Sequence, residues 1–313
     1  MSRYNIRLKK LNKNLQSIAF CNTFLYLNVK IRKHDMKVVI FDISNLMMRC
    51  LFAQIPSPTE TKFKEFKMTF LTSFMKVIKD NNPDKVIVVE DSESWRKEIY
   101  PDYKANRAAK RNASVVNFDV FFPVFSDFLE KLQSCFGNIQ FIKIPRSEAD
   151  DIIAVLVKNK PEWDIINVSS DKDFYQLFAY RNYKQFDGVK HEFIECFNPE
   201  QELLVKIILG DKGDNIPGLK RGVGPVKAMS LINENLEQWL DEQCLRERYE
   251  LNTKLISFKC IPKDIELSIM DNINNFKPGI FDGKKYFKFI QMEGLPGLMS
   301  TLAEYSEIIK KLK

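Results

Sequence analysis

Short runs of mainly apolar residues recur along the first two thirds of the chain. They are four residues long and mostly β-branched, as in strands that are covered on both faces of a sheet. The runs span residues 38–41, 86–89, 141–144 and 165–168. This pattern predicts four strands of a mostly parallel sheet.

Between these runs the apolar positions recur every three or four residues, which is typical of amphipathic helices. Residues 63–78, 118–132 and 148–158 follow this spacing. Because strand and helix alternate, we expect an α/β fold with a mostly parallel central sheet flanked by helices. After about residue 200 the strand pattern fades, and residues 203–209 and 225–240 carry helical patterns.

The patterns suggest three parts: an extension (1–35), an α/β core (36–200) and a mainly helical part (201–313). A chain of 313 residues with 45% hydrophobic residues can bury a sizeable core. It contains no run of about 20 apolar residues of the kind that crosses a membrane, so we expect no membrane association. We predict a monomer.

Residues 1–35 carry the whole net charge of +7, with eight basic side chains against Asp35, so the rest of the chain is balanced. Two interpretations of this segment stay open. It is a targeting segment, or it is a non-native or disordered extension upstream of a start at Met36, and we favour the extension. A nucleic-acid interface in the body must therefore rest on local basic patches.

Cysteine and histidine usage excludes several kinds of chemistry. The six cysteines are widely and irregularly spaced and form no CxxC pair, which argues against a zinc ribbon or a disulfide scaffold. Two histidines cannot supply a histidine-based metal cluster, and neither lies in a promising context. Catalysis must therefore use carboxylates, lysines, tyrosines or a metal ion.

Acidic residues follow each predicted strand at the point where it ends. Because the carboxyl ends of parallel strands meet at one edge of a sheet, these acids should converge although about 130 residues separate them. A cluster of carboxylates repels itself unless cations neutralise it, and an all-oxygen set favours Mg²⁺ or Mn²⁺. The acids are Asp42, Asp91, Glu148, Asp150, Asp151, Asp171 and Asp173.

Each acid also has a structural interpretation. Ser147 and Asp150 fit a capping box at the start of a helix, and Asp171 and Asp173 can simply form a turn. The loop GDKGDNIPG at 210–218 adds Asp211 and Asp214, and it either closes a helix or turns two carboxylates toward a second ion. The joint occurrence at four strand ends favours the metal site.

Two segments are suited to phosphate binding. Residues 95–111 interleave six basic residues with three aromatic ones directly after Asp91. Residues 219–228 (LKRGVGPVKA) place a Gly-x-Gly-Pro turn between basic residues, and the amides of a helix that starts there could hold a phosphate. The alternatives are a solvated basic helix face and a simple turn between helices.

These motifs resemble the flap endonuclease / 5′-3′ exonuclease family, and most closely its ribonuclease H branch from T-even phages. The similarity covers residues 36–230 firmly and continues more loosely to the C-terminus. It implies a nuclease core of the PIN/FEN type, with a helical arch at about 92–125 and a helix-turn-helix variant that grips duplex. The matching segments are VVIFDISN, VVED, WRKEIYPDYKANR, SEADDIIAVLVK, SSDKDFYQL and GDKGDNIPG.

The resemblance implies a role for each residue. A first Mg²⁺ ion, which Mn²⁺ can replace, would be held by Asp42, Asp91, Glu148, Asp150 and Asp171. A second would be held by Asp173, Asp211 and Asp214, with Asp151 near both. Lys104 and Arg96 would steer the scissile phosphate. Tyr103 and Arg107 would join them in the arch, and Lys220, Arg221, Gly222, Gly224 and Lys227 would grip duplex, in some members with a monovalent cation.

The resemblance further implies hydrolysis of phosphodiester bonds by two-metal-ion catalysis in nicked duplexes, RNA–DNA hybrids and 5′-flaps. The expected role is removal of RNA primers during lagging-strand replication, in the cytoplasm of a phage-infected bacterium. A single-stranded DNA-binding protein and a sliding clamp are the expected protein partners. Two alternatives remain: a non-catalytic protein that binds branched DNA, and a PIN-type ribonuclease.

Overall fold

The computed structural model describes residues 36–53 and 60–313, which form one compact unit from residue 36 onward. The sheet within it has the strand order β3-β2-β1-β4-β5-β6, and neighbouring strands are parallel except β5 and β6. Its strands are β1 (Met36–Asp42), β2 (Lys85–Val89), β3 (Gln140–Ile142), β4 (Trp163–Val168), β5 (Tyr183–Asp187) and β6 (Glu192–Ile194).

The central strand β1 is buried on both faces of the sheet, as its continuous apolar sequence predicts. Val39 and Phe41 enter one hydrophobic cluster, whereas Val38 and Ile40 enter another on the opposite face. The four strands expected from the sequence are therefore confirmed, and helices cover both faces of the sheet.

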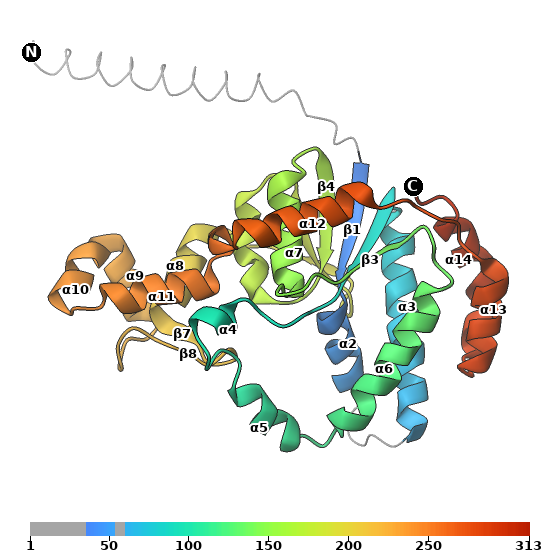
Figure 1. Ribbon diagram of the computed structural model, residues 1–313, viewed down its shortest axis with the longest axis horizontal. Coiled ribbons are helices and arrows are strands. Elements are labelled where there is room, and N and C mark those ends of the chain that lie inside the picture. Colours follow the sequence, from blue (N-terminus) through green and yellow to red (C-terminus); the bar gives the residue numbers. More distant parts are fainter. Residues whose placement is uncertain (1–35, 54–59) are drawn as a thin grey trace, which may run out of the picture. The chain divides into compact units, whose positions relative to one another are not determined.

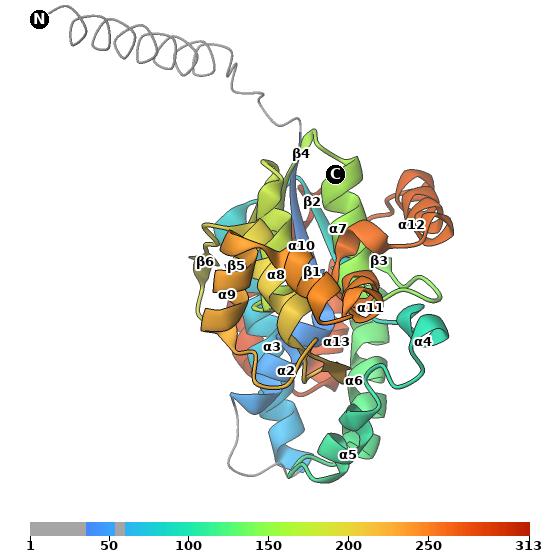
Figure 2. The ribbon, with the colours of Figure 1, turned by 90° about the vertical axis from the view of Figure 1, so that its left-hand side faces the viewer.

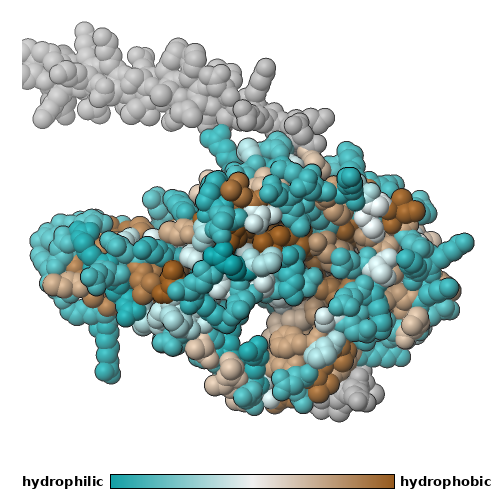
Figure 3. All heavy atoms as spheres, in the orientation of Figure 1, coloured by the Kyte–Doolittle hydropathy of each residue, from teal (hydrophilic) through white to brown (hydrophobic). Residues whose placement is uncertain are grey.

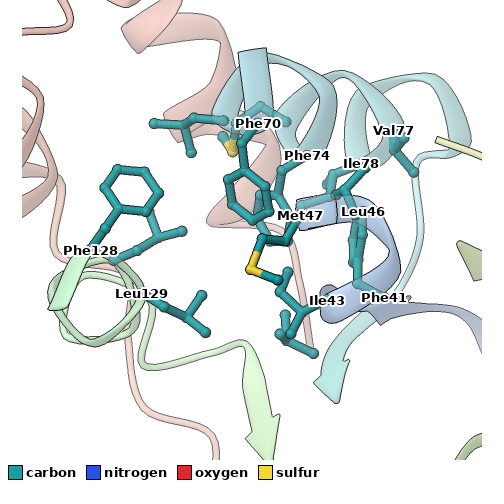
Figure 4. Close-up of a cluster of buried hydrophobic side chains, with 14 of the residues drawn as sticks. Phe41, Ile43, Leu46, Met47, Phe70, Phe74, Val77, Ile78, Phe128 and Leu129 are labelled. Carbon is teal, nitrogen blue, oxygen red and sulfur yellow. The ribbon is translucent and has the colours of Figure 1, made fainter. Parts of the chain in front are cut away.

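The first face is covered by helices from both ends of the chain (Figures 1 and 4). Phe41 and Phe74 pack with ring centroids 4.4 Å apart, and Phe70 meets Phe128 edge-on at 6.0 Å. Phe128 in turn packs on Phe289 of the last helices with ring centroids 5.2 Å apart, so aromatic contacts connect the first helices of the chain to the last ones. The helices are α2 (Ile43–Phe52), α3 (Glu60–Asn81), α6 (Phe118–Gln133), α13 (Gly283–Met292), η3 (Pro296–Thr301) and α14 (Leu302–Ile309).

The second face is covered mainly by α7 (Ala149–Asn159), which packs against β1 and β2. Its residues 152–157 are all buried. The 3₁₀ helix η1 (Lys172–Ala179) and helix α12 (Lys263–Asn275) complete this layer through residues such as Phe174 and Ile269. Because α7 begins where the strands end, its first turn lies at the carboxyl edge of the sheet.

A segment with little regular structure leaves the sheet after β2 and returns to it in α6 (Figure 1). It contains the short helices α4 (Arg96–Ile99) and α5 (Asn106–Asn112). A groove lies between this segment and α2, and Figure 3 shows the surface hollowed there. The arch expected at about 92–125 falls on this segment, and its function as an arch stays a prediction.

A group of four helices stands beside the sheet and faces the viewer in Figure 2. A tight hairpin of strands β7 (Gly210–Asp211) and β8 (Ile216–Pro217) follows the first of these helices. Two small hydrophobic clusters hold the group together. Its helices are α8 (Pro199–Leu209), α9 (Pro225–Glu234), α10 (Leu236–Glu242) and α11 (Arg246–Ile256), and the short 3₁₀ helix η2 (Phe258–Cys260) leads away from it.

The structure differs from the sequence predictions in four places. Strands β5 and β6 were not predicted, and the helix expected at 225–240 divides at Asn235, whose side chain caps α10 by accepting from Gln238 N. The capping box lies one residue later than expected, at Glu148 and Asp151. Finally, α12 to α14 return to the sheet, so the division near residue 200 does not separate compact units.

No helix among the described residues is long and apolar enough to cross a membrane. The basic extension 1–35 lies outside the described residues, and the expectations about it stay predictions.

Candidate metal centre and nucleic-acid interface

Asp42 ends β1 beside β4, at the point where the strand order changes direction, which is where ligands collect in open α/β sheets. Its Oδ1 accepts from Asn45 N at 3.0 Å and its Oδ2 from Ser169 Oγ at 3.0 Å. Burial and the nearby Asp91 raise the pKa of Asp42 to about 7, and Asp171 contributes in the same direction. The ends of three neighbouring strands thus place their carboxylates within electrostatic reach of one another.

The N-terminal end of α7 supplies further acids. Glu148, Asp150 and Asp151, here called the first carboxylate group, offer ligand atoms within 4.8 Å of one another. Asp91 is joined to this turn because its Oδ1 accepts from Ala149 N at 2.9 Å. Acids in a first helical turn also complement the helix dipole, which helps to hold them together.

Asp151 is fully buried and paired with Arg96, whose side chain is also buried. The NH2 nitrogen of Arg96 donates to Asp151 Oδ1 at 2.8 Å, and the NH1 nitrogen donates to Asp151 Oδ2 and to Glu148. Its Nε donates to Leu255 O at 2.8 Å. Each nitrogen of this guanidinium therefore already donates to a protein acceptor. Because it is not free to bind a phosphate, the expectation that Arg96 steers the scissile phosphate is revised.

Glu148 has several donors around it. Ser94 Oγ donates to its Oε2 at 2.7 Å, Tyr103 Oη lies 2.9 Å from the same oxygen, and Lys104 pairs with its Oε1. Burial opposes ionisation, but Lys104 and Arg96 outweigh it and lower the pKa of Glu148 to about 2. Glu148 therefore stays negatively charged at neutral pH.

The hydroxyl of Tyr103 also lies 3.0 Å from Asp214 Oδ2, and its ring is buried. Tyr103 thus lies between two carboxylates, and its expected part in the arch stays a prediction. Burial and Glu148 raise the pKa of this tyrosine, so it remains a hydrogen-bond donor.

Asp150 is held differently from its neighbours. Its Oδ1 atom is buried and has no hydrogen-bond partner among the described residues. Burial and the charges of Asp151 and Glu148 raise the pKa of Asp150 well above its usual value. A buried carboxylate oxygen without a partner costs free energy, which a cation at this position would offset.

Asp173, Asp211 and Asp214, the second carboxylate group, also offer ligand atoms within 4.8 Å of one another. Asp173 follows β4, whereas Asp211 and Asp214 come from the β7–β8 hairpin. This hairpin requires glycine at its first position. Gly210 has a φ of +69°, and a Cβ there would lie 2.3 Å from Ile216 O.

Lys206 of α8 lies within the second carboxylate group. Its Nζ pairs with Asp173 and lies 2.8 Å from Asp211 Oδ2. Burial raises the pKa of Asp173 to about 6 although Lys206 acts against it, and the same lysine, opposed by burial, lowers the pKa of Asp211. Lys206 thus provides one protein cation for both Asp173 and Asp211.

The two carboxylate groups meet at one small cavity, because Asp150, Asp173, Asp211 and Asp214 all line it. Lys104 also spans them, since its Nζ lies 3.6 Å from Asp214 Oδ2 while it pairs with Glu148. The predicted acids therefore lie along one rim, and their donor set is the all-oxygen set that Mg²⁺ and Mn²⁺ prefer. The residues fit divalent cations, with the orphaned oxygen of Asp150 as the clearest sign.

Basic side chains extend from this rim along the groove. Arg107 pairs with Asp214 at 2.7 Å, with half of its side chain exposed. Beyond it, Lys110 and Arg111 line the groove, and no described acid pairs with them. Apolar residues such as Phe122 also line the groove. A groove lined by both basic and aromatic side chains suits an unpaired nucleic-acid strand.

The second basic segment forms an exposed turn before α9, here called the basic turn (220–227). Gly222 has a φ of +86°, and Gly224 caps the helix with open space where its Cβ would be. The first residue of α9 is Pro225, and Lys227 is exposed. A phosphate can therefore approach the free amides at this helix start. The other predicted members, Lys220 and Arg221, are exposed as well.

Sequence reasoning missed Lys206, Asn45 and Ser169, which hold the acids in place. Lys206 has a recognisable signal, because it is the one charge within the apolar run 203–209. Asn45 and Ser169 lie within the matching segments VVIFDISN and SSDKDFYQL, but small polar residues near strand ends are common, so the residue type alone does not single them out.

Comparison with known proteins agrees with this architecture. A family model described as "5'-3' exonuclease, N-terminal resolvase-like domain" matches residues 37–205. The chain is 26% identical to ribonuclease H of Enterobacteria phage T4, over 86% of this chain and 95% of that protein. It is 32% identical to the flap endonuclease Xni of Shewanella denitrificans, over 63% and 77% of the two chains.

Two solved structures share the fold. The T5 D15 protein, co-crystallised with metal ions, aligns with a TM-score of 0.60 at 21% identity, over 76% of this chain and 98% of that one. The catalytic core of Rad2 in complex with DNA substrate aligns with a TM-score of 0.51 at 19% identity, over 88% and 94%.

Proposed function

The chain belongs to the 5′-3′ exonuclease family, and from that premise we propose that it is a metal-dependent 5′ nuclease. It hydrolyses phosphodiester bonds near the 5′ end or flap of a duplex. Its substrates are RNA–DNA hybrids and DNA duplexes with nicks or 5′-flaps, and its role is primer removal during replication. The flap endonucleases and the phage ribonuclease H among its relatives support this proposal.

One observation carries the proposal. Carboxylates from the ends of several strands and from the β7–β8 hairpin line one rim, and the buried Oδ1 of Asp150 has no hydrogen-bond partner among the described residues. Such an arrangement is unfavourable in isolation, and divalent cations are its usual remedy. A phosphodiester is the substrate that such ions can carry into an otherwise repulsive site.

We assign a first Mg²⁺ ion to Asp42, Asp91, Glu148, Asp150 and Asp171, and a second to Asp173, Asp211 and Asp214; Mn²⁺ is an acceptable substitute. Asp151 is left out as a direct ligand because Arg96 occupies both of its oxygens. When bound, two ions activate a water molecule and stabilise the leaving oxygen of a phosphodiester.

The residues of the chain itself bind and orient the substrate. Lys104, which pairs with Glu148 and Asp214 in this structure, can exchange these carboxylates for a phosphate oxygen when cations neutralise them. Arg107 stands beside it with an exposed side chain. Arg96 acts through Glu148 and Asp151 and is therefore a positioning residue.

The groove and the basic turn supply two different nucleic-acid contacts. The groove lined by Lys110, Arg111 and Phe122 takes the unpaired strand. The basic turn takes the phosphates of the duplex without reading sequence, with a monovalent cation as a candidate ligand. By analogy with the phage relative, a single-stranded DNA-binding protein and a sliding clamp are candidate partners in the cytoplasm of an infected cell. The protein acts as a monomer.

The test is cleavage of a 5′-labelled flap duplex and of an RNA–DNA primer duplex, with Mg²⁺ or with a chelator. We expect short labelled products with 3′-hydroxyl ends only when Mg²⁺ is present. Asp150→Asn should abolish them, whereas Asp164→Asn should not, because Asp164 pairs with Lys184 at the opposite end of β4. Binding of the duplex without cleavage by the unmodified chain would instead support the non-catalytic alternative.

A further inference from the structure

Residues 255–258, here called the strap, connect the end of α11 to η2, and the side chains of Arg96 and Gln176 link them by hydrogen bonds to the two carboxylate groups. On the side of the first group, Leu255 O accepts from Arg96 Nε at 2.8 Å. The same guanidinium donates to Glu148 and Asp151. A displacement of Leu255 therefore has to disturb the residue that orients these two carboxylates.

On the side of the second group, Gln176 makes the connection. Its Nε2 donates to Asp173 O at 3.0 Å and to Ile256 O at 3.2 Å. Its Oε1 accepts from Phe258 N at 2.9 Å. One amide side chain thus ties the backbone of a candidate metal ligand to two residues of the strap.

The strap also borders the space between the carboxylates. Leu255, Ile256 and Phe258 line the small cavity that Asp150 and Asp173 share. The strap is an apolar floor with no carboxylate of its own, so it adds no ligand. Its position instead sets how closely the two carboxylate groups can approach each other.

At its other end the strap continues into α11, which belongs to the helices that carry the basic turn. Asn252 is fully buried in α11, and its Nδ2 donates to Ile207 O and to Pro217 O, both at 3.0 Å. Ile207 lies in α8, just before the β7–β8 hairpin, and Pro217 is the last residue of that hairpin. Helix α11 is therefore fixed to α8 and to the hairpin that holds Asp211 and Asp214.

We propose that the strap couples occupation of the basic turn by duplex to the alignment of the two carboxylate groups, with Gln176 as the positioning residue. The inference rests on the proposed function, because it takes the basic turn to be a duplex-binding surface. By thermodynamic reciprocity, a duplex that improves this alignment must tighten binding of divalent cations.

The experiment measures this linkage without catalysis. Mn²⁺ is titrated calorimetrically into the full chain, alone and with a DNA hairpin that has neither flap nor nick, and the heat of Mn²⁺ binding to the hairpin is subtracted. We expect the hairpin to tighten Mn²⁺ binding by about fivefold or more in the unmodified chain. In Gln176→Met, which keeps the size of the side chain but loses its hydrogen bonds, the gain should fall below about twofold.

A matched control is Gln133→Met at the exposed end of α6, which should keep the full gain. Thermal unfolding of each variant shows that it is folded, and Asn252→Leu interrupts the same connection at its other end. Retention of the full gain by Gln176→Met and Asn252→Leu, or a hairpin that binds without tightening Mn²⁺, would overturn the coupling. Failure of the unmodified chain to cleave any flap would count against the proposed function alone.

Discussion

The Nζ atom of Lys104 lies 3.6 Å from the Oδ2 atom of Asp214. The same ammonium pairs with Glu148, so one cation spans the two carboxylate groups. Burial opposes its charge, but Glu148 and Asp214 outweigh burial and raise the pKa of Lys104. Lys104 also has a φ of +58°, an uncommon conformation that its backbone bond to Asp214 O at 2.9 Å helps to fix. The ammonium group of Lys104 is therefore held at the rim both by its ion pairs and by the backbone.

Lys104→Ala should slow single-turnover cleavage of a flap duplex by about 2.7–4 kcal/mol, by analogy with loss of one donor in a transition state. The reason is that no other protein cation touches both carboxylate groups among the described residues. Lys184→Ala is the control, because Lys184 pairs with Asp164 at the opposite end of β4 from the rim. Equal cleavage rates for the two variants would show that Lys104 takes no part in the reaction.

Asp150→Asn should separate stability from metal binding. Burial and Asp151 strongly raise the pKa of Asp150, so the metal-free chain must protonate this carboxyl group when it folds. The variant avoids that cost and should melt about 2–4 °C higher, which corresponds to about 1 kcal/mol. Mn²⁺ should bind more weakly to it in calorimetry. If the metal-free variant melted at a lower temperature than the unmodified chain, the Asp150 carboxyl group would stabilise the metal-free fold, and the prediction would be wrong.

Lys206→Met should have the opposite effect on both quantities. Without the ammonium, Asp173 and Asp211 lose their protein cation, and the metal-free chain should be destabilised by about 1–3 kcal/mol. Mn²⁺ should then take the place of the missing ammonium group, so the affinity of the chain for Mn²⁺ should rise. Calorimetry at pH 7.5 and denaturant unfolding measure the two effects, and unchanged Mn²⁺ affinity would mean that Lys206 does not compete with the ion.

Glu266 predicts a dependence of stability on pH that is independent of the rim. Burial opposes its ionisation, but Asn159, Lys263 and Lys158 outweigh it and lower the pKa of Glu266 in the folded chain. Its contribution is therefore complete above the unfolded pKa, near 4.5, and is lost as the pH falls through the lower folded value.

Glu266→Gln should accordingly reduce the free energy of unfolding by about 1–2 kcal/mol at pH 7, and by much less at pH 3. Urea unfolding at the two pH values is the measurement. A difference between the two chains that grows toward low pH would contradict the sign of this linkage.

Lys227→Gln should weaken duplex binding uniformly across sequences and reduce the slope of log K against log salt by about 0.9. Lys227 is exposed at the start of α9, beside the free amides of the basic turn. Lys288→Gln on the distant helix α13 is the control. Equal salt slopes for the two variants would exclude a phosphate contact at Lys227.

The rim was predictable because an apolar run followed by an acid is a local pattern, and parallel strands bring such ends together. The pairing of Arg96 was not predictable, because its partners Glu148, Asp151 and Leu255 lie 52 to 159 residues away. A basic residue in a basic segment therefore resembles a phosphate ligand in the sequence and is a buried structural cation in the fold.

Strand β5 escaped prediction for a related reason. Its sequence YKQFD contains buried polar residues, among them Gln185, whose Nε2 donates to Ser169 O and Asp171 O. The amide satisfies carbonyls at the loop that carries two of the acids. A strand whose polar residues serve the neighbouring site does not show the apolar run by which the other strands were found.

The aromatic layer beneath α3 and α6 is completed by α13 and α14, which come last in the sequence. During synthesis about 200 residues separate α3 from α13, which corresponds to roughly 10–40 s at 5–20 residues per second. Until α13 emerges, Phe128 lacks the contact that its ring makes with Phe289. The hydrophobic layer on this face of the sheet is therefore closed only by the last residues to be synthesised.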